Sequence, residues 1–146
     1  MSNRPVVAVL DYGIGNLRSA QKALDHVGAD ARLSADPTLI SDAAAVVLPG
    51  VGAFGRCAEA LGETGLDGIA TEAAEEASRG GRPFLGICVG LQLLHEGSQE
   101  APDWPGLGVL PGRVGLLPGN VKRPQMQWNR LDGDPDHPML AGVGGK

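Results

Sequence analysis

Three continuous apolar runs, each followed by a glycine-rich turn, constrain the fold of this chain more than any other feature. The runs span residues 5–10, 44–48 and 83–87. A strand that is apolar throughout is typical of a parallel sheet covered on both faces. Two amphipathic helical patterns, at residues 17–27 and 66–77, lie between these runs. The alternation predicts an α/β fold, namely a three-layer, mostly parallel sheet with helices on both faces.

The three glycine-rich turns span residues 11–16, 49–54 and 86–90. In such sheets ligands bind at the carboxyl ends of the strands, which lie along one edge. We therefore expect these turns to meet and form the functional site.

The chain has 146 residues, and we expect a single domain over residues 1–146. Its net charge of −5 argues against nucleic acid or an anionic membrane as partner. Two cysteines make no disulfide framework, and no leader segment or membrane-spanning run is evident. These features predict a cytoplasmic protein.

Further elements are expected from shorter patterns. Residues 29–33 predict another strand. Beyond residue 97, proline and glycine punctuate short segments, and we expect short antiparallel strands at residues 112–117 and 126–131. Residues 132–146 are mostly turn-forming.

Cys88 stands in Gly86-Ile87-Cys88-Val89-Gly90, where an apolar run gives way to an apolar helix start. This pattern predicts a nucleophile elbow, a sharp strand-to-helix turn that exposes a reactive side chain. Glycines on either side permit a tight bend and leave room beside the sulfur. The following helix start would favour the thiolate. The alternative is a buried structural cysteine, which is the interpretation we favour for Cys57 on a short helix.

Four segments together resemble the class I glutamine amidotransferases, and among them the glutaminase subunits of imidazole glycerol phosphate synthases. They are residues 11–19, 49–54, 85–94 and 124–129.

The resemblance implies that Cys88 attacks the side-chain amide of glutamine and forms a thioester. It also implies an oxyanion hole of backbone N–H groups. Val89 follows the nucleophile, and the 49–54 segment supplies Gly50, Val51 and Gly52. Gln92, one helical turn after Cys88, would help to hold glutamine, or else is only the polar side of a short helix.

The family's partner is a (β/α)8-barrel synthase subunit that receives the ammonia for histidine biosynthesis. Asn16, Arg18, Met126 and Trp128 match positions at or near that interface. Trp128 could instead be a core aromatic residue. The resemblance implies no cofactor and no metal.

The chain departs from the family at two places. Gln125 and Gln127 stand where the family usually has His and Gly. The family's catalytic His and Glu come from a C-terminal His-Pro-Glu motif, which none of the three histidines, His26, His95 and His137, matches. We therefore expect an amidotransferase domain without its C-terminal strands, inactive or nearly so by itself.

Three alternatives stay open. The chain could be a catalytically dead, truncated fragment that acts at most as a binding stub. It could be a thiol enzyme of a related α/β fold, although residues 124–129 argue against this. Gly13-x-Gly15 could bind phosphate, but the dinucleotide-binding fingerprint needs a third glycine.

Overall fold

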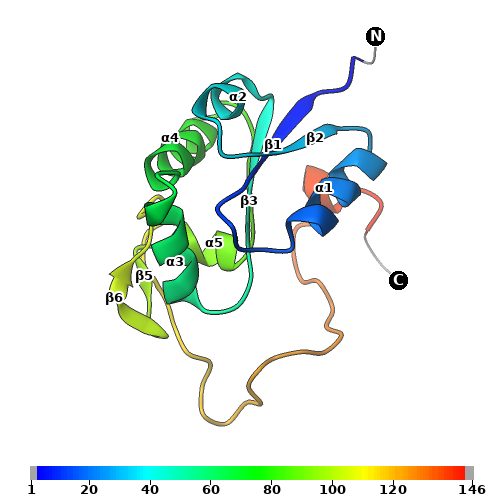
Figure 1. The fold of residues 1–146 in the computed structure, drawn as a ribbon. Coiled ribbons are helices and arrows are strands. Elements are labelled where there is room, and N and C mark those ends of the chain that lie inside the picture. Colours follow the sequence, from blue (N-terminus) through cyan, green and yellow to red (C-terminus); the bar gives the residue numbers. More distant parts are fainter. Residues whose placement is uncertain (1–2, 144–146) are drawn as a thin grey trace. The chain divides into compact units, whose positions relative to one another are not determined.

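The computed structural model describes residues 3–143 of the chain (Figure 1). They form two compact units, the first ending at Leu116 and the second starting at Leu117. Each unit is described by itself below.

A four-stranded parallel sheet lies at the centre of the first unit. Its order is β2-β1-β3-β4, so β4 forms one edge. This confirms the mostly parallel sheet and the strands expected from the apolar runs. The strands are β1 (Val6–Leu10), β2 (Asp30–Ser34), β3 (Ala45–Gly50) and β4 (Phe84–Cys88).

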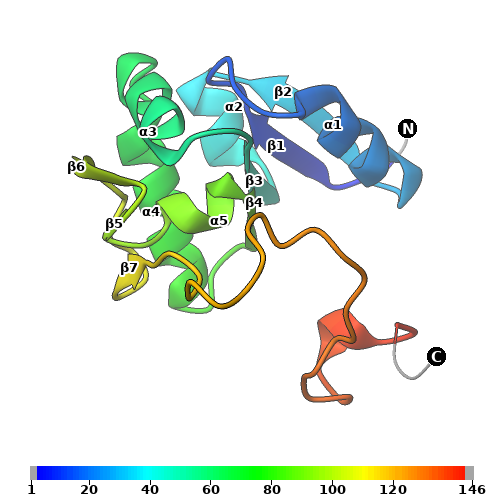
Figure 2. The ribbon, with the colours of Figure 1, turned by 90° about the horizontal axis from the view of Figure 1, so that it is seen from below.

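Five helices cover this sheet. Helix α1 lies on one face, and α3, α4 and α5 lie on the other (Figure 2). In the part of the chain described, no helix is long and apolar enough to cross a membrane. The helices are α1 (Leu17–His26), α2 (Pro37–Asp42), α3 (Phe54–Glu63), α4 (Asp67–Ser78) and α5 (Val89–Leu93).

Alternate residues of the strands feed two separate cores. Val7, Val9 and Val47 are buried under α1, whereas Ala8 and Val46 belong to a larger core that also contains residues of α2, α3, α4 and α5. Burial on both faces explains why these strands are apolar at successive positions. Leu85 and Ile87 of the edge strand β4 remain 41% and 39% exposed, so the covering of the sheet stops short of this edge.

Two helices differ from the prediction based on apolar periodicity: α2 was not predicted, and α3 is longer than expected. Helix α2 has only six residues, and local capping defines it: the Asp36 side chain accepts a hydrogen bond from the Thr38 N–H at 2.9 Å, and Pro37 occupies the first turn. The short helix expected around Cys57 is the ten-residue α3, which starts at Phe54.

The first unit also contains a small sheet of order β6-β5-β7. Its strands are β5 (Gly97–Ser98), β6 (Ala101–Pro105) and β7 (Arg113–Val114). The expected strand at residues 112–117 is thus reduced to two residues. It was also expected to be antiparallel, but β7 pairs with β5 in parallel, while β6 pairs antiparallel.

The second unit, described up to Val143, contains one 3-10 turn, η1 (Pro138–Leu140). The prediction of a strand at residues 126–131 is wrong. Punctuation of the sequence by proline and glycine suggested a short strand here, but no neighbouring strand pairs with it in the described chain, and isolated strands are not stable in water. The turn-forming character expected after residue 132 is confirmed as far as Val143.

Candidate active site

Cys88 lies where β4 ends and α5 begins, with backbone angles φ 56° and ψ −117°. A positive φ is unfavourable for a residue with a Cβ, and such strain concentrates at functional sites. The Cys88 side chain is also exposed. Both observations fit the predicted nucleophile elbow and exclude a buried structural role for this cysteine. Cys57, in contrast, is fully buried, as expected.

The two glycines flanking Cys88 have a different role from the one expected. The sharp bend is at Cys88 itself, and the glycines instead permit close backbone contacts. A Cβ on Gly90 would collide with the carbonyl oxygen of Leu48, and one on Gly86 would lie 2.7 Å from the Leu91 Cα. The space beside these glycines is therefore filled by the backbones of β3 and α5.

The end of β3 lies directly beside Cys88. Gly50 is paired with Cys88 in the β3–β4 register. A Cβ on Gly50 would lie 2.6 Å from the Gly90 nitrogen, so only glycine permits this approach between the end of β3 and the start of α5. The segment expected to supply the oxyanion hole is thereby brought next to the candidate nucleophile.

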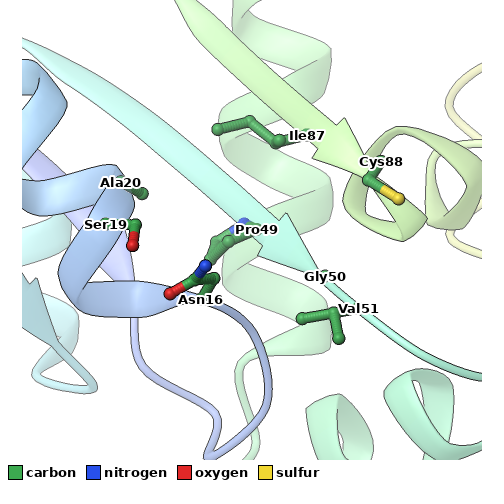
Figure 3. Close-up of a pocket in the computed structure, with 8 residues that line it drawn as sticks. All are labelled: Asn16, Ser19, Ala20, Pro49, Gly50, Val51, Ile87 and Cys88. Carbon is green, nitrogen blue, oxygen red and sulfur yellow. The ribbon is translucent and has the colours of Figure 1, made fainter.

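A cavity of about 350 Å³ opens at this edge of the sheet (Figure 3). All three glycine-rich turns contribute to it, as the sequence predicted. Figure 3 shows Cys88 at the tip of β4, Gly50 and Val51 at the end of β3, and residues of the start of α1 across the opening. The lining residues are Asn16, Ser19, Ala20, Pro49, Gly50, Val51, Ile87 and Cys88.

The remaining candidate residues of the first unit lie around this cavity. Val89 is buried immediately after Cys88, and Gly52 follows Val51 with φ 84°. Gln92 is partly buried on α5 but does not line the cavity. Asn16 lines it, whereas the exposed Arg18 donates a hydrogen bond to Gln21 Oε1 at 2.9 Å.

Met126 and Trp128 belong to the second unit. Their side chains are 84% and 102% exposed there. Trp128 is therefore not a core aromatic residue of this unit. Both side chains are thus exposed in the described part of this unit, and their interface role stays a prediction.

No histidine accompanies Cys88 in the cavity lining. His26 is the last residue of α1, and the His95 ring places Nδ1 3.2 Å from the carbonyl oxygen of Pro111. In the second unit, the His137 ring accepts a hydrogen bond from the Met139 N–H at 3.2 Å. Among residues 3–143, no group of three or more His, Cys, Asp or Glu residues could hold a metal ion.

Two buried side chains, Tyr12 and Cys57, support the end of β3, a role that the sequence did not predict for either of them. The Tyr12 hydroxyl donates a hydrogen bond to the Pro49 carbonyl oxygen at 2.5 Å, and the Cys57 thiol donates one to the Val51 carbonyl oxygen at 3.3 Å. Burial, together with the neighbouring Cys57, raises the pKa of Tyr12 well above its ordinary value. The sequence carried one signal, a cysteine in the first turn of the helix that follows the loop.

Comparison with known proteins identifies the family. The model of the family described as glutamine amidotransferase class-I matches residues 8–129. The chain belongs to this family. A solved structure described as a glutamine amidotransferase superposes on 71% of this amidotransferase chain with a TM-score of 0.55 and 25% identity, covering 52% of that structure.

Curated relatives of this amidotransferase carry the name imidazole glycerol phosphate synthase subunit HisH. The relative from Symbiobacterium thermophilum is 45% identical over 137 residues, which are 94% of this chain and 63% of the relative. The one from Methanothermobacter thermautotrophicus is 46% identical, over 94% of this chain and 67% of the relative. The chain thus spans roughly two thirds of the length of these relatives.

Proposed function

We propose that this chain is a glutaminase subunit of imidazole glycerol phosphate synthase, which releases ammonia from glutamine for histidine biosynthesis. The observation that carries the proposal is the pairing of Gly50 with the exposed, strained Cys88 at the edge of a cavity. The names of the relatives, at 45% and 46% identity, support the choice of synthase.

The proposed chemistry is acyl transfer. The Cys88 thiolate attacks the side-chain amide carbon of glutamine, and the carbonyl oxygen becomes an oxyanion. The carbon–nitrogen bond then breaks, ammonia leaves with an added proton, and a γ-glutamyl thioester remains on the sulfur. Water attacks the thioester, which gives glutamate and restores the thiol.

The oxyanion would be held by backbone N–H groups. Val89 supplies one as the residue after the nucleophile, and Gly50, Val51 and Gly52 supply the others from the end of β3. Each such donor is worth about 2.7–4 kcal/mol of transition-state stabilisation. Gln92 would contact the bound glutamine from α5.

Proton transfer sets the expected rate. His26 and His95 both lie outside the cavity lining, so neither is placed to take the thiol proton or to protonate the departing nitrogen. General acid–base catalysis contributes about 10²–10⁴-fold to such reactions. We propose that Cys88 acylates slowly in this chain and that turnover is correspondingly low.

The proposed partner is a (β/α)8-barrel synthase subunit, with a cytoplasmic setting. Asn16 and Arg18 would contact it from the start of α1, and Met126 and Trp128 from the second unit. Exposed tryptophan and methionine are enriched where protein interfaces bury apolar surface.

Ammonia release from glutamine tests this function, measured for the chain alone and with the barrel subunit. We expect slow release that the Cys88→Ala substitution abolishes. Mass spectrometry of the acid-quenched chain should show the γ-glutamyl adduct on Cys88. Ammonia release at rates typical of enzymes would contradict the proposal that no residue of the cavity serves as a general base for Cys88. Absence of the adduct under all conditions would contradict the proposed glutaminase function.

The second candidate is a binding stub without catalysis. The exposed Met126 and Trp128 favour it, because they could serve an interface without any chemistry at Cys88. It would be supported if the barrel subunit bound the chain while no adduct formed on Cys88.

A further inference from the structure

Two side chains from distant parts of the sequence bond to the same short stretch of backbone at the end of β3. Tyr12 follows β1 and bonds to the carbonyl of Pro49, whereas Cys57 lies in the first turn of α3 and bonds to the carbonyl of Val51. Within residues 3–143, no other side chain donates a hydrogen bond to a carbonyl of residues 49–53.

The two bonded carbonyls belong to the peptides on either side of the Gly50–Val51 peptide. In a trans peptide the C=O and the following N–H point in opposite directions. A Pro49 carbonyl directed at Tyr12 therefore directs the Gly50 N–H away from Tyr12. In the same way, the bond to Cys57 directs the Gly52 N–H away from the Cys57 sulfur. The two bonds thus fix the direction of two N–H groups in the candidate oxyanion hole.

We propose that Tyr12 and Cys57 are positioning residues that hold the Pro49–Gly52 backbone in the orientation in which its N–H groups can serve the reaction at Cys88. This proposal rests on the proposed glutaminase function. Neither side chain lines the cavity, so both act through the backbone rather than on the substrate.

The surroundings make this arrangement stiff. Tyr12 is 2% and Cys57 is 0% exposed, so both donor side chains are shielded from water. The raised pKa of Tyr12 keeps its hydroxyl protonated, and hence a donor, at any physiological pH. Val51, in contrast, is 47% exposed, and a Cβ on Gly52 would meet nothing within 4 Å, so packing gives this loop little other support.

The experiment compares two reactions of Cys88 in the full chain. Acylation by a γ-glutamyl aryl ester builds an oxyanion and needs the hole, whereas alkylation by iodoacetamide displaces iodide and needs none. We expect Tyr12→Phe and Cys57→Ala each to slow acylation about 10-fold to 100-fold, somewhat less than full loss of one donor. Alkylation should stay within about twofold of the wild-type rate, because a merely structural loss would move both reactions together.

Two further variants sharpen the comparison. Cys57→Ser retains a donor and should recover most of the acylation rate. Ser34→Ala removes another buried side-chain bond, from the Asp36 N–H to Ser34 Oγ at the end of β2, and should leave the ratio of the two rates unchanged. Equal losses of acylation and alkylation in Tyr12→Phe, or no loss of either, would overturn the proposal.

Amide hydrogen exchange gives a second readout that does not depend on the function. We expect exchange at Gly50 and Gly52 to rise at least about 10-fold in Tyr12→Phe and Cys57→Ala, with β1 amides unchanged. If the wild-type chain is alkylated but never acylated, the glutaminase function fails, and exchange alone then decides whether the two residues hold the loop. Unchanged exchange at both glycines would overturn the positioning role.

Discussion

Gly90, in the first turn of α5, lies against Leu48 of β3 so closely that a Cβ on Gly90 would collide with the Leu48 carbonyl oxygen. This contact fixes the start of α5 against the end of β3. Since Cys88 immediately precedes α5 and Gly50 is the last residue of β3, the same contact sets the candidate nucleophile beside its candidate oxyanion donors.

Replacing this glycine should damage both stability and the site. We expect Gly90→Ala to lower the free energy of unfolding by about 2–3 kcal/mol, because a backbone oxygen cannot move aside as a side chain can. Urea denaturation measures the loss. The matched control is Gly62→Ala in α3, where a Cβ meets nothing within 4 Å. That change should raise stability by about 0.5–1 kcal/mol, and an equal loss in both variants would contradict the steric argument.

The two cysteines should differ sharply in reactivity. Cys88 is exposed, whereas Cys57 is 0% exposed and donates to the Val51 carbonyl. We expect iodoacetamide to label Cys88 at least about 100-fold faster than Cys57 in the native chain, since buried thiols are inert. Peptide mapping by mass spectrometry measures both sites, and denatured chain should show the difference vanish. Comparable native rates would mean that α3 opens readily.

The single tyrosine of the chain should titrate abnormally. Burial, with Cys57 beside it, raises the folded-state pKa of Tyr12 above its ordinary value of 10.0. The unfolded chain therefore loses this proton first. The stabilisation is present in full below about pH 10 and is lost as the pH rises toward the folded-state value, at about 1.4 kcal/mol per pH unit.

Tyrosinate absorbance follows this residue alone. We expect the signal to appear only together with unfolding, and the Tyr12→Phe variant to lack this component of the alkaline loss of stability. A reversible titration near pH 10 in the folded chain would show that the Tyr12 hydroxyl is accessible to water and not held by Pro49.

Arg82 should be the most costly arginine to replace among those in ion pairs. Its side chain is 19% exposed, its Nε lies 2.8 Å from Glu76 Oε2, and NH1 donates to the carbonyls of Ile40, Ser41 and Ala43. We expect Arg82→Met to lower the free energy of unfolding by about 2–4 kcal/mol, because it leaves these acceptors without a donor.

The matched control for Arg82 is Arg79→Met. Arg79 is 70% exposed and pairs with Glu75 at 3.9 Å. Such an exposed ion pair contributes little to stability, so we expect the free energy of unfolding to change by no more than about 0.5 kcal/mol. Thermal unfolding of the two variants in parallel separates the effect of anchoring the end of α2 from that of surface charge.

The parts of the fold that follow from local pattern were predictable. The apolar runs at residues 5–10, 44–48 and 83–87 identified three strands of a parallel sheet, because only burial on both faces requires such runs. Helix α2 was not predictable from periodicity, since six residues give no repeat and only the cap defines it. The strand expected at residues 126–131 failed because a strand depends on a neighbour that the pattern does not specify.

The sequence by itself determined the elbow at Cys88, because a buried strand, a glycine-flanked cysteine and a helix start are all local features. Only the tertiary structure decided what surrounds that sulfur. The contact of Gly90 with Leu48 joins residues 42 positions apart, and the bond from Tyr12 to Pro49 joins residues 37 positions apart, so no local pattern encodes either. The bond from Cys57 to Val51 spans only six positions and left one local signal, the cysteine in the first turn of α3. Their cause is close packing, which selects partners by their place in the folded chain.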